Sequence, residues 1–131
     1  MKRRISFVLG TAVLAGLAVL PTQTATADVH RVRIVTGQGS VACTDGFVCL
    51  YENSGLNQPS PGRVLLTDGN IGWLSDYGFN DITSSVCNHT GVRATLYADS
   101  GMQGDWIMVD PGTCNNVPDW FNDTASSLHL N

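Results

Sequence analysis

Hydrophobic positions after about residue 40 fall into short segments rich in Val, Ile, Leu, Thr and aromatic residues, and these segments are separated by Gly, Asp, Asn and Pro. This pattern is typical of the strands of a compact β-sandwich. No stretch after residue 27 keeps the apolar period of about 3.6 residues that an amphipathic helix needs, so we expect little helix. The predicted strands lie near residues 47–52, 62–67, 70–75, 82–88, 93–98, 104–109, 112–117 and 125–130.

The strand pattern occurs twice in the chain, and this internal repeat fixes the fold hypothesis. Residues 50–56 return as residues 96–102, with Leu-Tyr and Ser-Gly at matched positions and an offset of 46. Residues 62–68 and 79–85 return with an offset of 42. A four-residue insertion at 58–61 accounts for the difference. The chain therefore contains two copies of one β unit of about 40 residues.

The two units, near residues 47–88 and 92–131, are predicted to form a single domain over residues 43–131. One unit alone has one apolar face to bury, and two units bury their faces by packing together, so we predict an all-β sandwich. Gly62 and Gly104 follow the first strand of each unit at matched positions. We expect both to adopt a positive φ, which glycine tolerates without steric cost. An ordinary hairpin turn is the alternative role for these glycines.

Residues 1–27 have the pattern of a secretory signal peptide. Three basic residues precede an apolar run at 5–20, and Ala-Thr-Ala at 25–27 offers small residues for cleavage. Glycine and threonine interrupt the apolar run and no charge cluster follows it, which favours a cleaved leader over a transmembrane anchor. We therefore expect a secreted chain of bacterial type that begins at Asp28, with residues 28–42 as an N-terminal extension.

Without this leader the chain carries four basic residues, all arginine, and all eleven acidic residues, so its net charge is −7. A nucleic-acid-binding protein needs a basic surface to neutralise phosphates, and this composition argues against that class. Cations are the ligands that an acidic surface favours. We expect no membrane contact once the leader is removed, and a monomer.

The four cysteines, at positions 43, 49, 87 and 114, predict two disulfides in a small exported domain. None of their spacings matches the short paired spacing of a zinc knuckle. Four cysteines allow three pairings. We favour Cys43 with Cys49, across an Asp-Gly turn, and Cys87 with Cys114.

Two hexapeptides at matched positions carry the most functional information. Residues 80–85 read Asn-Asp-Ile-Thr-Ser-Ser, and residues 122–127 read Asn-Asp-Thr-Ala-Ser-Ser. Calcium takes about six to eight oxygen ligands from carboxylates, amides, hydroxyls and backbone carbonyls, and each hexapeptide supplies several of these kinds. Turn capping by Asn, Asp and Ser is the alternative role. Duplication at matched positions favours the calcium interpretation.

On these hexapeptides the chain resembles the βγ-crystallin superfamily, whose calcium-binding members carry the pattern N/D-N/D-x-x-S/T-S once per Greek key. A second mark of that family is an aromatic residue, four residues, an aromatic residue, one residue and glycine. Tyr97, Met102 and Gly104 match it with methionine in the second aromatic place, whereas the insertion interrupts the pattern that starts at Tyr51. The resemblance implies two Greek-key motifs packed as a βγ-crystallin-type β-sandwich.

The same resemblance implies two calcium sites between the paired motifs. The implied ligands are Asn80, Asp81, the Ile82 carbonyl and Ser84 for one motif, and Asn122, Asp123, the Thr124 carbonyl and Ser126 for the other. In the family one motif also contributes an acidic or amide side chain to the ion held by the other, and the sequence leaves open which of the two leading residues does so. A further oxygen is expected from the hairpins, near Glu52 or Asn53 and near Ala98 or Asp99.

A second resemblance rests on the opening Cys43-x5-Cys49-Leu50-Tyr51. In a secreted, two-disulfide chain of this size it looks like the bacterial peptidase inhibitor family I36, whose members include inhibitors of secreted metalloproteases. The resemblance implies a secreted protease as a partner. The candidate contact loop comprises Gln58, Pro59, Ser60, Pro61, Gly62 and Arg63, in which proline lowers the ordering cost of binding. A surface insertion without function is the alternative.

No motif of a catalytic site is present in the sequence. There is no G-x-S-x-G, no H-E-x-x-H and no paired Cys and His, and the three histidines, His30, His89 and His129, are scattered. We therefore expect no enzymatic activity. Three tryptophans, Trp73, Trp106 and Trp120, could stack on a carbohydrate, but we expect them to be core or partly buried residues of the sandwich.

Overall fold

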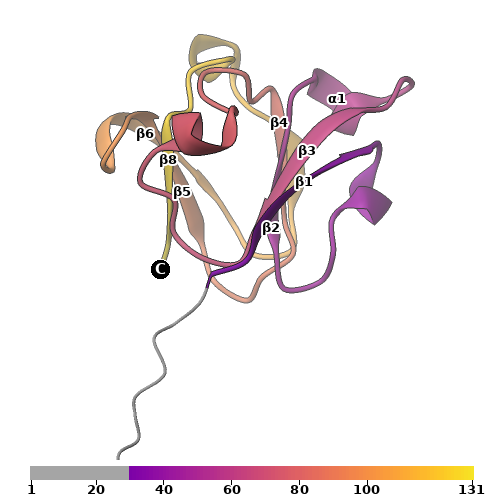
Figure 1. Cartoon of the computed structure of the whole chain (residues 1–131), viewed down its shortest axis with the longest axis horizontal. Coiled ribbons are helices and arrows are strands. Elements are labelled where there is room, and N and C mark those ends of the chain that lie inside the picture. Colours follow the sequence, from indigo (N-terminus) through magenta and orange to yellow (C-terminus); the bar gives the residue numbers. More distant parts are fainter. Residues whose placement is uncertain (1–29) are drawn as a thin grey trace, which may run out of the picture.

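The computed structural model describes residues 30–131, which form two packed antiparallel sheets (Figure 1). The predicted leader at 1–27 lies outside these residues. The strands are β1 (Val32–Gly37), β2 (Val48–Tyr51), β3 (Gly62–Thr67), β4 (Ser85–Asn88), β5 (Ala94–Asp99), β6 (Gln103–Val109), β7 (Cys114–Asn116) and β8 (Ser127–Leu130). Short helices are α1 (Ser54–Asn57) and 3-10 turns at Ser40–Ala42, Leu74–Tyr77 and Asp119–Phe121. None of the helices in the described part has the length and apolar character needed to span a bilayer.

The two units exchange strands between the sheets. One sheet has the order β1-β3-β2-β4-β7 and the other has the order β6-β5-β8. Strand β7 of the second unit pairs with β4 of the first, and Ile71 of the first unit bridges Leu128 on β8 of the second. Each unit therefore completes the sheet of the other, and the predicted all-β sandwich of two Greek keys is confirmed.

All but one of the predicted strands coincide with observed ones. The exception is 70–75, where only Ile71 makes a β-bridge before a 3-10 helix begins at Leu74, so this prediction was wrong. The sequence predicted no strand before residue 47, yet β1 pairs with β3 along its whole length. The expectation of little helix is confirmed, because even α1 contains left-handed residues at Gly55 and Leu56.

The core between the sheets is aliphatic with two phenylalanines, Phe79 and Phe121, both fully buried. Trp73, Trp106 and Trp120 were predicted as core or partly buried residues, and that prediction was wrong: they are 57%, 51% and 63% exposed. For Trp106 the reason is strand alternation, since Ile107 and Val109 on β6 pack against the core and Trp106 therefore faces outward. Neither of the other two lies on a strand: Trp73 precedes the 3-10 turn at Leu74–Tyr77, and Trp120 lies within the 3-10 turn at Asp119–Phe121.

A second apolar cluster covers the outer face of the larger sheet. It comprises Cys43, Phe47, Cys49, Tyr51, Val64, Leu66 and Cys87, with Val35 and Ala42 packed against it. Both predicted disulfides, Cys43–Cys49 and Cys87–Cys114, lie in or beside this cluster and are confirmed. The segment that precedes the repeat therefore belongs to the folded domain.

The two matched glycines differ in backbone conformation. Gly104 has the predicted positive φ of 81°, and a Cβ there would lie 2.5 Å from an Asp99 carboxylate oxygen. Gly62 does not have a positive φ, so the expectation for it was wrong. The insertion moves the left-handed turn to Asn57, with φ 59°, because asparagine tolerates this region better than most residues.

Candidate metal sites

The two hexapeptides lie side by side in the loops that lead into β4 and β8. The Asp81 N–H donates to the Ala125 carbonyl, and the Asp123 N–H donates to the Thr83 carbonyl, at 3.0 Å in both cases. These matched bonds hold each loop against the other across the pseudo-twofold relation of the units. The structure thus brings together the two motifs that the sequence singled out.

The aspartates cross between the motifs. Ser84 Oγ donates to Asp123 Oδ1 at 3.1 Å, and Ser126 Oγ donates to Asp81 Oδ1 at the same distance. The sequence left open whether the first or the second residue of a motif reaches the other motif. In the structure it is the second residue, the aspartate, that does so.

Backbone conformation explains how the aspartates reach across. Asp81 and Asp123 both lie in the left-handed region, with φ of 58° and 55°. This region is costly for most L-residues, and Asp and Asn are the polar residues that visit it most often. The aspartates are exposed, whereas their partners Ser84 and Ser126 are only 7% and 8% exposed. Each aspartate therefore lies at the surface, above a serine whose hydroxyl group is buried.

Each aspartate–serine pair lies next to the hairpin of the serine's own unit. The Ser84 N–H donates to the Tyr51 carbonyl at 2.9 Å, and the Ser126 N–H donates to the Tyr97 carbonyl at 2.8 Å. The first pair is therefore beside the first hairpin and the second pair beside the second hairpin. This matches the predicted contribution of the hairpins in position, although Glu52 uses both carboxylate oxygens to accept bonds from the backbone and guanidinium of Arg63.

The last serine of each hexapeptide has a different task that the sequence reasoning missed. Ser85 Oγ donates to the Asn53 carbonyl and accepts from the Leu56 N–H. Ser127 Oγ makes the equivalent bonds, to the Asp99 carbonyl and from the Met102 N–H. Both serines are fully buried. The sequence signal for this role was that the same serine occurs at the last position of both motifs. In each unit this serine holds the turn of the hairpin in place by hydrogen bonds.

The remaining predicted ligands lie around the two pairs. Asn80 and Asn122 are exposed, and Ile82 and Thr124 are half-buried. The Thr124 carbonyl lies 3.4 Å from Ser126 Oγ. Carboxylate, amide, hydroxyl and carbonyl oxygens are the donors that a hard divalent cation prefers, so the residues present fit calcium in their chemistry.

The insertion forms an exposed loop with a rigid base. Gln58, Pro59, Ser60, Pro61 and Arg63 are exposed, and Gly62 is buried. At the base Asn57, which is 1% exposed, accepts from the Asn53 N–H and donates to the carbonyls of Gly37 and Arg63. A buried amide with three bonds fixes the point from which the loop projects.

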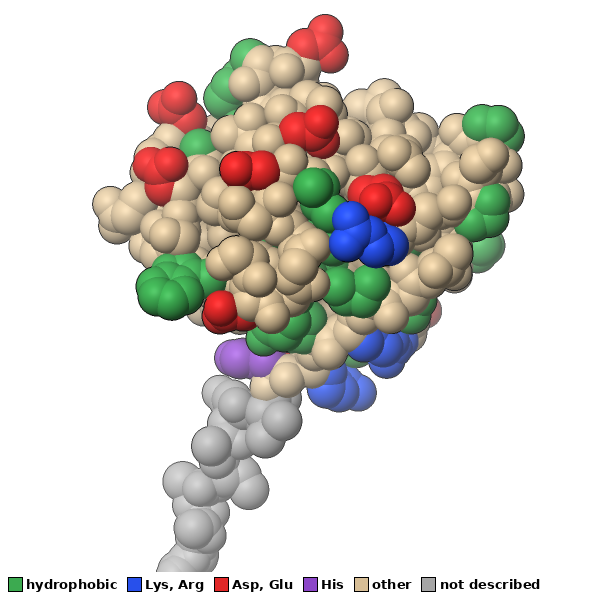
Figure 2. Space-filling model, turned by 45° about the horizontal axis from the view of Figure 1, so that its top comes forward, with side chains coloured by type: hydrophobic (Ala, Val, Ile, Leu, Met, Phe, Trp, Pro, Cys, Tyr) green, Lys and Arg blue, Asp and Glu red, His purple; other side chains and the backbone are tan. Residues whose placement is uncertain are grey.

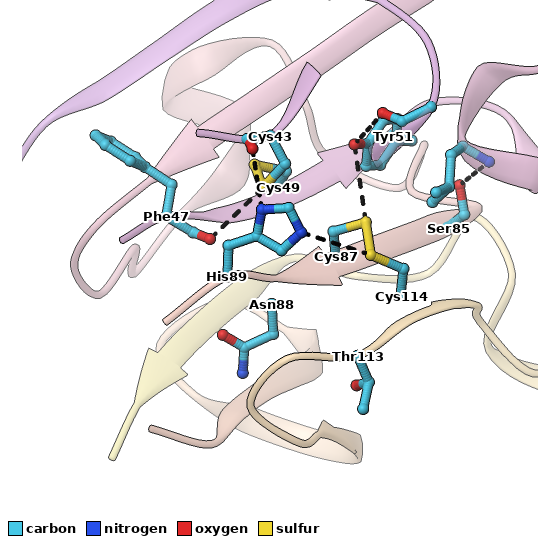
Figure 3. Close-up of a disulfide and its surroundings, with 12 residues drawn as sticks. Cys43, Phe47, Cys49, Tyr51, Ser85, Cys87, Asn88, His89, Thr113 and Cys114 are labelled. Atoms are coloured by element: carbon cyan, nitrogen blue, oxygen red, sulfur yellow. Dashed lines mark hydrogen bonds between the residues drawn. A yellow bond between two sulfur atoms is a disulfide. The ribbon is translucent and has the colours of Figure 1, made fainter. Parts of the chain in front are cut away.

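His89 lies between the two disulfides (Figure 3). Its Nδ1 is 2.9 Å from the Cys43 carbonyl oxygen, and its Nε2 is 3.8 Å from Cys114 Sγ. Cys87, His89 and Cys114 have the closeness of a metal-ligand cluster. The sulfurs are bonded to each other, however, so they offer no thiolate to a metal or a substrate.

The surface charge of the described residues is mainly negative. Figure 2 shows acidic side chains spread over the visible face and basic ones gathered on one side. Three of the four arginines in residues 30–131 form ion pairs, Arg31 with Asp68, Arg63 with Glu52 and Arg93 with Asp110. Neither Asp81 nor Asp123 has a basic partner among residues 30–131. The negative charge at the hexapeptides is thus not neutralised by an arginine.

Comparison with known proteins assigns the family. The family model described as peptidase inhibitor family I36 matches residues 37–109, more than half of the chain. This chain belongs to peptidase inhibitor family I36. The Cys43–Cys49 opening and the insertion loop both lie within the matched residues. No curated protein matches the chain.

Solved structures similar to this I36 chain are βγ-crystallin domains. One, described as "Evolution of the eye lens beta-gamma-crystallin domain fold", is 23% identical with a TM-score of 0.63 and covers 77% of this chain and 97% of that one. A βγ-crystallin from Ciona intestinalis is 25% identical with a TM-score of 0.55, covering 65% and 99%. The N-terminal domain of protein S is 27% identical with a TM-score of 0.52, covering 65% and 94%. Both resemblances drawn from the sequence are confirmed, and family and fold are both non-catalytic kinds of protein.

Proposed function

We propose that this I36 chain is a secreted, non-enzymatic calcium-binding protein with one site at each crossed aspartate–serine pair. The observation that carries the proposal is the reciprocal contact of Asp123 with Ser84 and of Asp81 with Ser126, at 3.1 Å in both pairs. Two exposed carboxylates without an arginine partner in residues 30–131 remain available to a cation. The two disulfides support an oxidising, extracellular compartment.

The crossed contacts divide the proposed ligands into two sets. One set is Asn80, the Ile82 carbonyl, Ser84 and Asp123, and the other is Asn122, the Thr124 carbonyl, Ser126 and Asp81. When bound, calcium supplies a positive charge that ligands from both units contact at the same time. Since each set takes residues from both units, ligand binding stabilises the packing of one unit on the other by mass action.

Titration calorimetry of the purified, metal-free chain with calcium tests the proposal. We expect about two equivalents to bind, and magnesium at the same concentration to compete poorly, because it demands a stricter octahedral geometry. No binding heat together with a melting temperature that is the same in calcium and in chelator would reject the proposal.

A second candidate function is peptidase inhibition, favoured by the match to family I36. The exposed loop at 58–63 is the proposed contact, because its base is fixed by the buried Asn57 while its tip is free to enter a protease cleft. A pre-ordered loop loses little entropy on binding. Calcium binding and inhibition use different parts of the molecule, so one chain can carry both.

Deleting residues 58–61 is expected to abolish inhibition of a secreted protease and to leave calcium binding intact. The measurement is residual activity across a panel of secreted metalloproteases and serine proteases mixed with the purified chain. Ser100→Ala, at the tip of the second hairpin that lacks an insertion, is the matched control and should inhibit like the native chain. Undiminished inhibition by the deletion variant would exclude this loop as the contact.

A further inference from the structure

The equivalent strands β3 and β6 differ in how many neighbours they have. Strand β3 pairs with β2 on one side and with β1 on the other. Strand β6 pairs only with β5, and no strand of residues 30–131 pairs with its other edge (Figure 1). The segment before the repeat thus supplies a partner strand to the first unit, and the second unit has no counterpart.

Side-chain exposure follows the same difference. Val64 and Leu66 on β3 are 0% and 1% exposed, within the outer cluster that also contains Phe47. Their counterparts on β6 by the offset of 42 are Trp106 and Met108, which are 51% and 47% exposed. Two large apolar side chains therefore flank an open strand edge. Proteins usually protect such an edge, because it can pair with another chain.

The backbone groups available on β6 can be identified by comparison with β3. The Glu52 N–H donates to the Arg63 carbonyl and the Asp68 N–H donates to the Arg31 carbonyl, so Arg63 faces β2 and Asp68 faces the β1 side. Alternation in an antiparallel ladder then places the backbone groups of residues 64, 66 and 68 toward β1. The equivalent residues 106, 108 and 110 face the open edge of β6.

An aspartate holds the residue that immediately precedes β1, the strand that pairs with β3. Asp68 Oδ1 accepts from the Arg31 backbone N–H at 2.7 Å, and Asp68 Oδ2 accepts from Arg31 Nε at 2.8 Å. The bond from the Arg31 N–H holds the pKa of Asp68 below its usual range. Its counterpart on β6 is Asp110, which is exposed and accepts a bond from Arg93 Nε at 3.0 Å. The second unit therefore has the acidic group and lacks the strand.

We propose that the open edge of β6 binds an extended segment of another protein, which adds antiparallel to β6 with an arginine or lysine beside Asp110. The partner is a basic, partly apolar peptide, because β1 with Arg31 and Arg33 is the segment that the equivalent edge binds. Backbone bonds at residues 106 and 108 supply the affinity of such strand addition, and Trp106 and Met108 contact its apolar side chains. A second copy of β6 is disfavoured, because it would bring the aspartates at 105 and 110 of two acidic strands together.

A peptide with the sequence of residues 30–37 tests the proposal as the probe. Added to the purified chain, it should slow amide hydrogen exchange at Trp106 and Met108 and leave Val64 and Leu66 unchanged. Met108→Pro removes an edge-facing N–H at a position where an edge strand tolerates proline, and should weaken binding about tenfold or more. Asp110→Asn should weaken it by about threefold, the size expected of an exposed ion pair. Met108→Ala, which keeps the N–H, is the matched control for Met108→Pro.

Several results would overturn the proposal. One is that the amide hydrogen exchange of residues 106 and 108 is not slowed at any peptide concentration up to about 1 mM. A dissociation constant above about 1 mM would be too weak to assign to a specific site. Another is protection lost at residues 33 and 35 of the chain itself, which would mean that the peptide displaces β1. A third is a dimer of the free chain in sedimentation that Met108→Pro removes, which would assign the edge to a second copy. If Met108→Pro does not fold, the exchange data on the native chain and the affinity of Asp110→Asn still decide.

Discussion

A chain with both Asp81→Ala and Asp123→Ala is expected to gain no thermal stability from calcium, whereas the native chain gains on the order of 20 °C in melting temperature. Each proposed site adds about 2.7 kcal/mol at a free calcium concentration of about 100 times its dissociation constant. Two sites together add about 5 kcal/mol, and a domain of this size shifts by about 4 °C for each kcal/mol. Differential scanning calorimetry in calcium and in chelator measures the difference.

The matched control for this double variant is Asp76→Ala with Asp119→Ala. These exposed aspartates lie in the first turns of the 3-10 helices that precede the two hexapeptides, so the control removes the same charge outside the hexapeptides. It should keep the full response to calcium. The single variants Asp81→Ala and Asp123→Ala should each keep about one equivalent of calcium, because each aspartate belongs to one proposed set. A calcium response in the double variant equal to the native one would contradict the crossed assignment.

Removing the Cys87–Cys114 disulfide with alanine at both positions is expected to lower the free energy of unfolding by about 3.5 kcal/mol. The bond closes a separation of 27 residues and joins β4 of the first unit to β7 of the second. The Cys43–Cys49 bond closes only 6 residues, and its removal should cost about 2 kcal/mol by the same loop-closure entropy. Urea unfolding of the two double variants and the native chain makes the comparison.

The order of these two losses is the informative result. Both cysteine pairs lie in or beside the outer cluster, so the loss of buried sulfur affects both variants in a similar way. A larger loss from the Cys43–Cys49 variant would mean that native packing, and not the length of the closed segment, sets the contribution of each bond. His89 contacts the backbone carbonyl of Cys43, which alanine keeps, and Sγ of Cys114, which alanine removes, so only the Cys87–Cys114 variant loses a His89 contact.

The internal repeat is the reason that so much of the fold could be predicted. Matching residues 79–85 to 121–127 located the two motifs, and the structure places them side by side through the bonds of Asp81 and Asp123. The disulfide pairing followed from a tight turn and from the predicted export of the chain. The role of the hexapeptides as calcium ligands stays a prediction, since the contacts within the chain reveal the donors and not the ion.

Other features depend on tertiary contacts that no local pattern carries. The apolar run at 70–75 reads as a strand, but the exchange between sheets gives it a partner only at Ile71. The outward direction of Trp106 depends on which face of β6 meets the core. Strand β1 did carry a sequence signal, because Val32, Arg33 and Ile34 alternate in polarity. The strand was missed because it precedes both repeat units, on which the strand prediction was based.

Strand exchange also limits how this fold could have arisen from a smaller ancestor. A single 40-residue unit would lack the neighbour that β7 gives to β4 and that Ile71 gives to β8. Such a unit could complete its sheets only by associating with an identical copy, as a symmetric homodimer. Fusion of two copies of the gene for such a unit would leave each half free to diverge. The proline-containing insertion in the first half and the open edge of β6 in the second are differences of this kind.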